Sequence, residues 1–157
     1  MSHPALDAAA LYLDDLVVGQ TFETATHLID VEQIMAFARN FDPQPFHLDD
    51  EAAKQTLFGG LCASGWHTAA ITMRLIVDMR PNFANGVIGK GGEISWPQPT
   101  RPGDILKVFS TIAAITPSRS RPDRGVVTML LETKNQRGEI VQVFKPQLVV
   151  FRRDAKP

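Results

Sequence analysis

The spacing of apolar and polar residues predicts a strand followed by a helix near the start of the chain. Residues 21–29 (TFETATHLI) alternate as a strand does, with one face carrying Phe22, Thr24, Thr26 and Leu28. Asp30 and Gln33 then have the spacing of a capping box, with Asp in place of Ser or Thr. A helix is therefore predicted from Val31 to about residue 40.

Two prolines separate this helix from the next helical segments. Pro43 and Pro45 remove amide donors, and they bias the residues before them, Asp42 and Gln44, toward extended conformations. A second short helix is predicted to start near residue 49 or 50 and to end before residue 59. Residues 64–79 (SGWHTAAITMRLIVDM) are apolar around nearly the whole circumference, a pattern typical of a buried helix.

The second half of the chain carries strand signals only. After a glycine-rich loop at 86–92, segments rich in β-branched residues cover 92–96, 105–115, 126–133 and 140–151, separated by turn signals. Successive strands without helices between them pair antiparallel, so the sequence predicts an α+β domain whose sheet covers one buried helix. We expect one domain at 15–152, between an N-terminal lead-in at 1–14 and a C-terminal tail at 153–157.

The composition of the chain limits the classes of partner that we expect it to bind. The 157 residues are 44% hydrophobic, which suits one core, and their net charge of −1 gives no basic field for nucleic acid. No window reaches 18 uninterrupted apolar residues, so no membrane span is expected. The N-terminus lacks the pattern of a signal peptide, and the single cysteine cannot form an internal disulfide, so a cytoplasmic location is expected.

Asp42 and His47, in the stretch FDPQPFHLDD, are the leading candidates for chemistry. A carboxylate and an imidazole can together hold and polarise one water, and the prolines between them would fix their separation. The alternative is structural: Asp42 would close a turn and His47 would bond to backbone. A metal site is not expected, because zinc-type histidine spacing is absent.

The stretch FGGLCASGWHT supplies a second candidate site. Gly65 has no side chain to block approach, and its amide at a helix start would be an unpaired donor suited to an oxyanion. Packing or capping glycines are the alternative. Ser64 fits a helix N-cap, since a nucleophilic serine would be expected between flanking glycines. His67 is predicted to be a core histidine with satisfied hydrogen bonds.

Together these motifs resemble the MaoC-like dehydratase family, which includes (R)-specific enoyl-coenzyme A hydratases. The likeness rests on Asp42-x-x-Pro45-x-His47, on Ser64-Gly65 opening a helix, and on the WPQPTRPGD segment at 96–104. It spans about residues 15–151 and implies a hot-dog fold, with an antiparallel sheet wrapped around a long central helix. It also implies a homodimer, or a higher oligomer built from it.

The resemblance implies a site and a reaction. Asp42, His47 and Gly65 match the family's catalytic residues, while Ser64, Gln44 and Phe41 would contact the substrate, each departing from the family's usual residue. Water would add across the C2–C3 bond of an enoyl thioester of coenzyme A or acyl carrier protein, in fatty-acid metabolism, with no separate cofactor. An acyl-CoA thioesterase and a non-catalytic thioester-binding domain remain alternatives.

Overall fold

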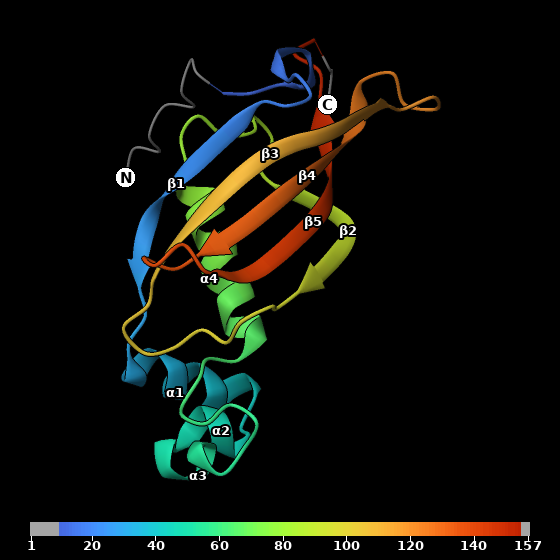
Figure 1. Cartoon of the computed structure of the whole chain (residues 1–157). Helices are drawn as coiled ribbons and strands as arrows, with labels where there is room; N and C mark the ends of the chain where they lie inside the picture. Colours follow the sequence, from blue (N-terminus) through green and yellow to red (C-terminus); the bar gives the residue numbers. More distant parts are fainter. Residues whose placement is uncertain (1–9, 155–157) are drawn as a thin grey trace, which may run out of the picture.

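One antiparallel sheet of five strands organises the molecule (Figure 1). The computed structural model describes residues 10–154. The strands run in the order β1-β3-β4-β5-β2. Their bounds are β1 Thr21–Leu28, β2 Ile88–Ser95, β3 Ile105–Pro117, β4 Arg124–Lys134 and β5 Ile140–Phe151. Because short turns join β3 to β4 and β4 to β5, these strands pair with their neighbours in sequence, and β1 and β2 form the edges.

A single long helix, α4 (Gly65–Asp78), packs on one face of the sheet. Three shorter helices, α1 (Val31–Phe41), α2 (Pro45–Leu48) and α3 (Asp50–Lys54), gather at one end, remote from the described chain ends (Figure 1). This arrangement confirms the predicted α+β class and the hot-dog fold. No helix in residues 10–154 is long and apolar enough to cross a bilayer.

The core lies between α4 and the sheet. Strand β4 alternates without interruption between buried and half-buried residues, and α4 contributes Ile71, Leu75 and Ile76 from its inner face. Each such side chain contributes roughly 1.5–3 kcal/mol when fully buried. However, α4 is less enclosed than its sequence predicts, because Trp66, Met73 and Val77 are exposed on its outer face.

Strand β1 and its junction with α1 follow the prediction in part. Asp30 caps α1 by accepting the Gln33 amide (2.9 Å), but the Gln33 side chain bonds to Leu28 O, so only half of the capping box forms. The predicted face also breaks in mid-strand. A register shift between Glu23 and Thr26 alters the alternation, which leaves Leu28 57% exposed.

The glycine-rich segment predicted as a loop is largely strand. Residues 88–91 pair with β5 as the first half of β2, and only the second half was predicted. At Gly92 an added Cβ would lie 2.7 Å from Lys145 O, so the strands approach more closely than a side chain would allow. Glycine here permits pairing, whereas the sequence signal was interpreted as a break.

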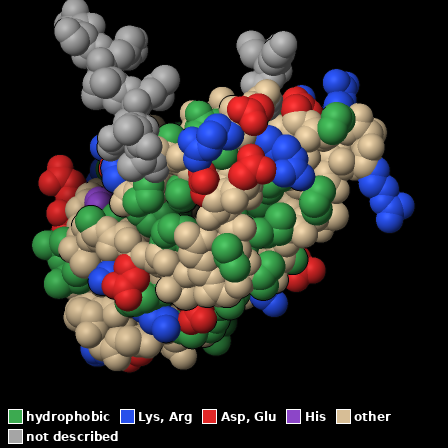
Figure 2. Space-filling model, turned by 90° about the horizontal axis from the view of Figure 1, so that it is seen from above, with side chains coloured by type: hydrophobic (Ala, Val, Ile, Leu, Met, Phe, Trp, Pro, Cys, Tyr) green, Lys and Arg blue, Asp and Glu red, His purple; other side chains and the backbone are tan. Residues whose placement is uncertain are grey.

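The last residues of the predicted lead-in pack against the domain, while residues 1–9 and 155–157 lie outside the described residues. Leu11 forms a bridge with Phe83, and Leu13 belongs to the core. Nearby, Arg152 and Arg153 pair with Asp14 and Asp15 (2.7 and 2.6 Å). Figure 2, a view from this end, shows acidic and basic side chains interspersed, in keeping with the near-zero net charge.

Candidate active site

The chain between α1 and α2 brings Asp42 and His47 together. Helix α1 ends at Phe41, and both Asp42 and Gln44 leave the helical conformation, as predicted from the prolines that follow them. Pro45 then starts α2, a position that suits its fixed φ and missing amide hydrogen. This short helix was not predicted. It places His47 Nε2 3.3 Å from Asp42 Oδ2.

His47 is buried and held on both ring nitrogens. Its Nδ1 donates to the Cys62 carbonyl oxygen (2.7 Å), and a carbonyl can only accept, so the ring carries its hydrogen on Nδ1. The other nitrogen, Nε2, therefore faces the Asp42 carboxylate. Only 5% of His47 is exposed, and the Phe46 ring packs edge-on against it. The structural alternative, in which His47 only bonds to the backbone, explains the contact of Nδ1 with the Cys62 carbonyl but not the contact of Nε2 with Asp42.

The surroundings of Asp42 keep it ionised. Burial by itself would raise the pKa of this carboxyl, but the Ser64 hydroxyl, the Gln44 amide and His47 outweigh burial and hold the pKa below its ordinary value. Gln44 Nε2 donates to Asp42 Oδ1 at 2.6 Å. Ser64 Oγ is buried and helps to lower the pKa of Asp42, although within residues 10–154 it has no partner at full hydrogen-bonding geometry. Asp42 is therefore suited to accept a proton.

Gly65 opens α4 beside this pair, with its amide available. Within residues 10–154 no acceptor takes the Gly65 N–H, whereas the amides of His67 and Thr68 both bond to Ser64 O. Ser64 occupies the N-cap position, as predicted, but its side chain makes no capping bond. An added Cβ at Gly65 would lie within 2.9 Å of the Trp96 ring, so glycine is required sterically as well.

These groups border a cleft of about 700 Å³. Its walls come from α2, from residues 57, 58 and 63, from the first turn of α4 and from residues 96–101. Gln44, His47 and Gly65 line it, whereas Asp42, Ser64 and Phe41 do not. Asp42 contacts the lining residue His47, and Ser64 directly precedes Gly65, but Phe41 is 74% exposed and contacts the Phe37 ring. The structure thus gathers every predicted site residue except Phe41. Among the described residues, no group of three or more potential metal ligands is placed to hold an ion.

Cys62 lies next to His47 without forming a nucleophilic pair. Its Sγ is 3.7 Å from Nδ1, but that nitrogen is occupied by the Cys62 carbonyl. Burial raises the pKa of the Cys62 thiol to about 11, so the thiolate is negligible at neutral pH. The contribution of Cys62 to the site is its backbone oxygen.

His67 is a core residue, as predicted, but it lacks the predicted hydrogen bond. Its ring stacks on Phe37 (4.6 Å between centroids), and its buried Nδ1 has no partner in residues 10–154. Burial, with a smaller contribution from the charge of His27, lowers the pKa of His67 to about 4 from the ordinary 6.5. His67 is therefore neutral in the folded protein at pH 7.

This pKa makes His67 a source of acid sensitivity. Between pH 6.5 and about 4 the unfolded chain binds the proton and the folded chain does not, so stability falls as the pH falls. Across this pH range the free energy of unfolding is expected to fall by about 3 kcal/mol. His67→Phe should flatten this part of the curve, measured by urea unfolding at pH 7, 6, 5 and 4. A variant with the slope of the parent would contradict this explanation.

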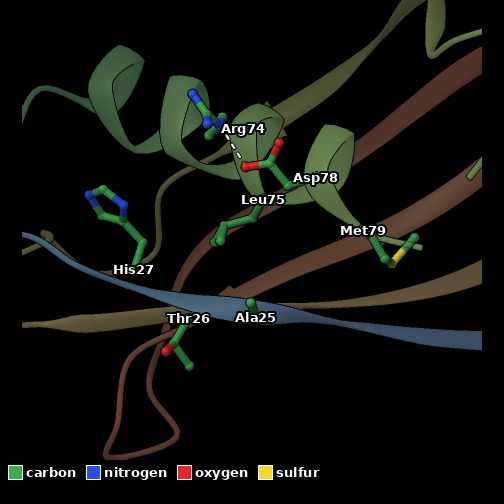
Figure 3. Close-up of a pocket in the computed structure, with 7 residues that line it drawn as sticks. All are labelled: Ala25, Thr26, His27, Arg74, Leu75, Asp78 and Met79. Atoms are coloured by element: carbon green, nitrogen blue, oxygen red, sulfur yellow. Dashed lines mark hydrogen bonds and ion pairs between the residues drawn. The ribbon is translucent and has the colours of Figure 1, made fainter. Parts of the chain in front are cut away.

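A second cleft, of about 410 Å³, lies between β1 and α4 (Figure 3). Its arginine, aspartate and histidine side chains already bind one another or residues outside the cleft. Arg74 Nε donates to Asp78 Oδ2 (2.6 Å), and His27 Nε2 bonds to Gln33 (2.7 Å). No acid and base face each other across it as Asp42 and His47 do. The cleft beside α2 is therefore the better candidate for chemistry.

Sequence reasoning missed three contributors to the site: the Cys62 carbonyl, Trp96 and Arg101. Trp96 and Arg101 belong to the WPQPTRPGD segment, which contributed to the family resemblance, but the sequence did not predict which residues their side chains contact. Trp96 covers Gly65 from 31 positions away and donates to Gln142 Oε1 (2.9 Å). A carbonyl acceptor leaves no trace in a side-chain pattern. No local signal could have identified it.

Comparisons with known proteins agree with the observed fold. The family model described as MaoC like domain matches residues 15–135. The crystal structure of a MaoC-like dehydratase from Rhodospirillum rubrum is 60% identical, covering 93% of this chain and all of that one, with a TM-score of 0.91.

Two further relatives carry names that specify a reaction. A 3-hydroxybutyryl-CoA dehydratase of Methylorubrum extorquens is 31% identical over 112 residues, 71% of this chain and 69% of that protein. The R-hydratase PhaJ1 of Pseudomonas aeruginosa is 25% identical, covering 94% of this chain and 95% of that one, with a TM-score of 0.74.

Proposed function

The chain belongs to the MaoC-like dehydratase family, and from this we propose that it hydrates enoyl thioesters and dehydrates the corresponding 3-hydroxyacyl thioesters. One observation carries the proposal: an ionised carboxylate and an imidazole nitrogen lie 3.3 Å apart beside a free helix-start amide. Coenzyme A is the proposed carrier, by analogy with the dehydratase of Methylorubrum extorquens and its 3-hydroxybutyryl-CoA.

In the proposed reaction Asp42 and His47 share one water. Asp42 removes a proton as the water oxygen bonds to C3. Nε2 of His47, which carries no hydrogen while Nδ1 does, takes this proton from Asp42 across their short separation and delivers it to C2, which restores both groups. The net change is the addition of one water, and the reverse sequence is dehydration.

The Gly65 amide would stabilise the thioester oxygen. Negative charge develops on this oxygen as C3 is attacked, and an unpaired N–H at the start of α4 is the appropriate donor. Phe46, Phe58 and Trp96 line the same cleft and supply apolar surface for an acyl chain.

The experiment is an absorbance assay with crotonyl-CoA and longer enoyl-CoA compounds, run beside a free-thiol assay. Loss of the enoyl absorbance without thiol release supports hydration. Thiol release would instead indicate a thioesterase. Binding without change in either signal, measured by calorimetry with crotonyl-CoA, would indicate a thioester-binding domain.

We propose a homodimer as the assembly, with higher oligomers built from it. Edge strand β2 is exposed along most of its length, and the outer face of α4 exposes Trp66, Met73 and Val77, so a second copy would cover both. Sedimentation equilibrium should give twice 17.3 kDa. Met73→Lys should shift the mass toward the monomer, whereas a monomeric parent would contradict the proposal.

The proposed cellular location and metabolic role follow from the chemistry of the chain. We propose the cytoplasm, because the chain has one cysteine and its thiol is buried. Acyl-thioester metabolism, as in fatty-acid turnover, follows from the proposed substrate.

A further inference from the structure

The Arg101 guanidinium donates hydrogen bonds to backbone carbonyls near Asp42 and His47. Nη1 donates to Gly60 O (2.8 Å) and Leu61 O (3.3 Å), and Nη2 donates to Phe58 O. These three acceptors lie in the segment that joins α3 to α4. Within residues 10–154 Arg101 pairs with no carboxylate, unlike Arg137, which pairs with Asp104. Its hydrogen bonds are therefore directed to the carbonyl dipoles of one loop, while its charge also acts on Asp50, whose Oδ1 accepts the Leu61 amide (2.9 Å).

The residues that follow this loop position His47. The Cys62 carbonyl accepts the Nδ1 hydrogen of His47, and the Cys62 amide donates to Phe46 O (3.2 Å). The Ala63 amide donates to Thr100 O (2.9 Å). The segment is thus attached to α2 on one side and to residues 100–101 on the other. Any displacement of residues 58–61 would move the acceptor that orients the imidazole.

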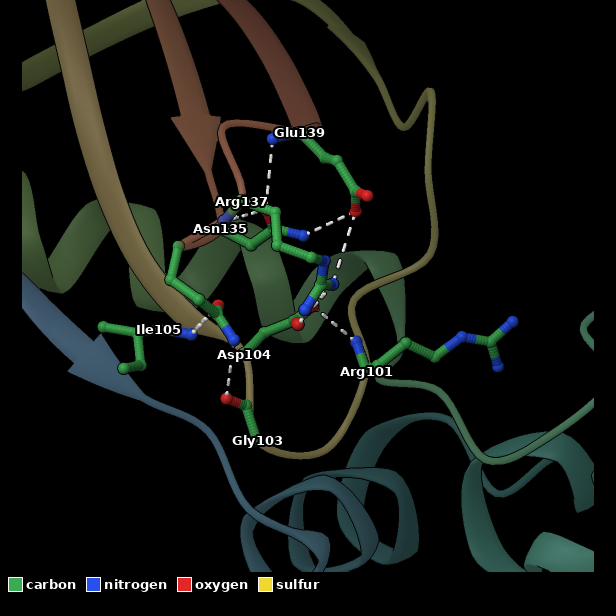
Figure 4. Close-up of polar contacts among 8 residues, drawn as sticks. Arg101, Gly103, Asp104, Ile105, Asn135, Arg137 and Glu139 are labelled. Atoms are coloured by element: carbon green, nitrogen blue, oxygen red, sulfur yellow. Dashed lines mark hydrogen bonds and ion pairs between the residues drawn. The ribbon is translucent and has the colours of Figure 1, made fainter.

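Asp104 anchors the backbone from which Arg101 extends. Only 2% of this residue is exposed, and its Oδ2 accepts the Arg101 amide (2.9 Å) while Oδ1 accepts Arg137 Nη2 (3.1 Å). Figure 4 shows Asp104 at the centre of this network and the Arg101 side chain pointing away from it. Asp104 therefore fixes the start of the Arg101 side chain, and the carbonyls fix its end.

We propose that Arg101 is a positioning residue for His47. By holding the carbonyls of residues 58–61 it fixes Cys62 O, which keeps hydrogen on Nδ1 and leaves Nε2 toward Asp42. Arginine suits this role because its planar fork presents several donors at once, whereas lysine presents a single charged point. The effect on turnover rests on the proposed hydratase function, but the effect on the imidazole does not.

The test compares Arg101→Met with Arg74→Met as the control, because Arg74 pairs with Asp78 on α4 and bonds neither to Asp104 nor to residues 58–63. Nitrogen-15 NMR of the histidine rings reports the tautomer of His47 without any substrate. We expect the Nδ1-protonated form in the parent and in Arg74→Met, and a mixture of tautomers in Arg101→Met. An unchanged His47 spectrum in a folded Arg101→Met protein would overturn the proposal, whether or not the parent proves to be a hydratase.

Kinetics separate positioning from substrate binding. We expect kcat of Arg101→Met to fall about 10- to 100-fold, with KM little changed, on both crotonyl-CoA and the phosphate-free crotonyl-N-acetylcysteamine. A higher KM confined to the coenzyme A substrate, with kcat intact, would instead make Arg101 a phosphate-binding residue. Should Arg101→Met fail to fold, Arg101→Lys carries the test, with an intermediate kcat expected and the parent value contradicting the proposal.

Discussion

Asp42→Asn is expected to lower kcat for hydration of crotonyl-CoA by about 10²- to 10⁴-fold, the range typical of a general acid or base. Asparagine has the shape of aspartate, so its amide oxygen can still accept from Gln44 Nε2 and its NH₂ can donate to His47 Nε2. The fold should therefore be retained. What disappears is the carboxylate that takes a proton from water.

The measurement is the initial rate of absorbance loss, with unfolding curves to confirm that stability is preserved. Asp49→Asn is the matched control, because Asp49 caps α3 through the Ala52 amide and asparagine caps helices equally well. The surroundings of Asp42 hold its pKa below its ordinary value, so the parent carboxylate is ionised at neutral pH and the two proteins can be compared there. Asp42→Asn turning over at the parent rate would remove Asp42 from the mechanism.

The parts of the fold that could be predicted depend on local physics. The prolines after Phe41 end α1 because they lack amide hydrogens. The Asp30 carboxylate caps the start of that helix by accepting the amide of Gln33, only three positions further along the chain. Alternation predicted β4 well because this central strand keeps one face toward the core along its length, so buried and half-buried residues alternate from Arg124 to Lys134. These features need no knowledge of distant residues.

The failures arise where a partner strand or a distant side chain decides the outcome. The register shift in β1 depends on pairing with β3, and the first half of β2 depends on the close approach of β5 at Gly92. Pro45 was interpreted as a break, but it is also a favourable first residue of a helix.

The same division holds within the site. The proximity of Asp42 and His47 was predictable, since they lie five positions apart with two prolines between them. The Cys62 carbonyl, the Arg101 guanidinium and the Trp96 ring reach the site from other segments, so only the folded chain reveals them.

Gly65→Ala is expected to reduce kcat/KM about 100- to 1,000-fold, the loss seen when one oxyanion donor is removed. The added Cβ would lie 2.6 to 2.9 Å from three atoms of the Trp96 ring. Trp96 cannot easily move aside, because its Nε1 donates to Gln142, a fully buried residue. The first turn of α4 must shift instead, and it carries the Gly65 amide away from the thioester oxygen.

The same overlap should destabilise the protein by about 1–3 kcal/mol, the usual range for overpacking. Gly60→Ala is the matched control from the same cleft region, because its Cβ would meet Asp50 Oδ1 and Arg101 Nη1 at ordinary distances of 3.5 and 3.6 Å. Rates on crotonyl-CoA and urea unfolding curves should therefore separate the two variants.

A second substitution distinguishes a displaced amide from a blocked cleft. Trp96→Leu in the Gly65→Ala background removes the ring atoms that the new methyl group meets, so α4 can return to its original position. Part of the lost stability and kcat should return if displacement of the amide is the cause. If stability returns and kcat does not, the methyl group itself excludes the thioester. Parent-like kcat/KM in Gly65→Ala alone would mean that a different donor binds the thioester oxygen.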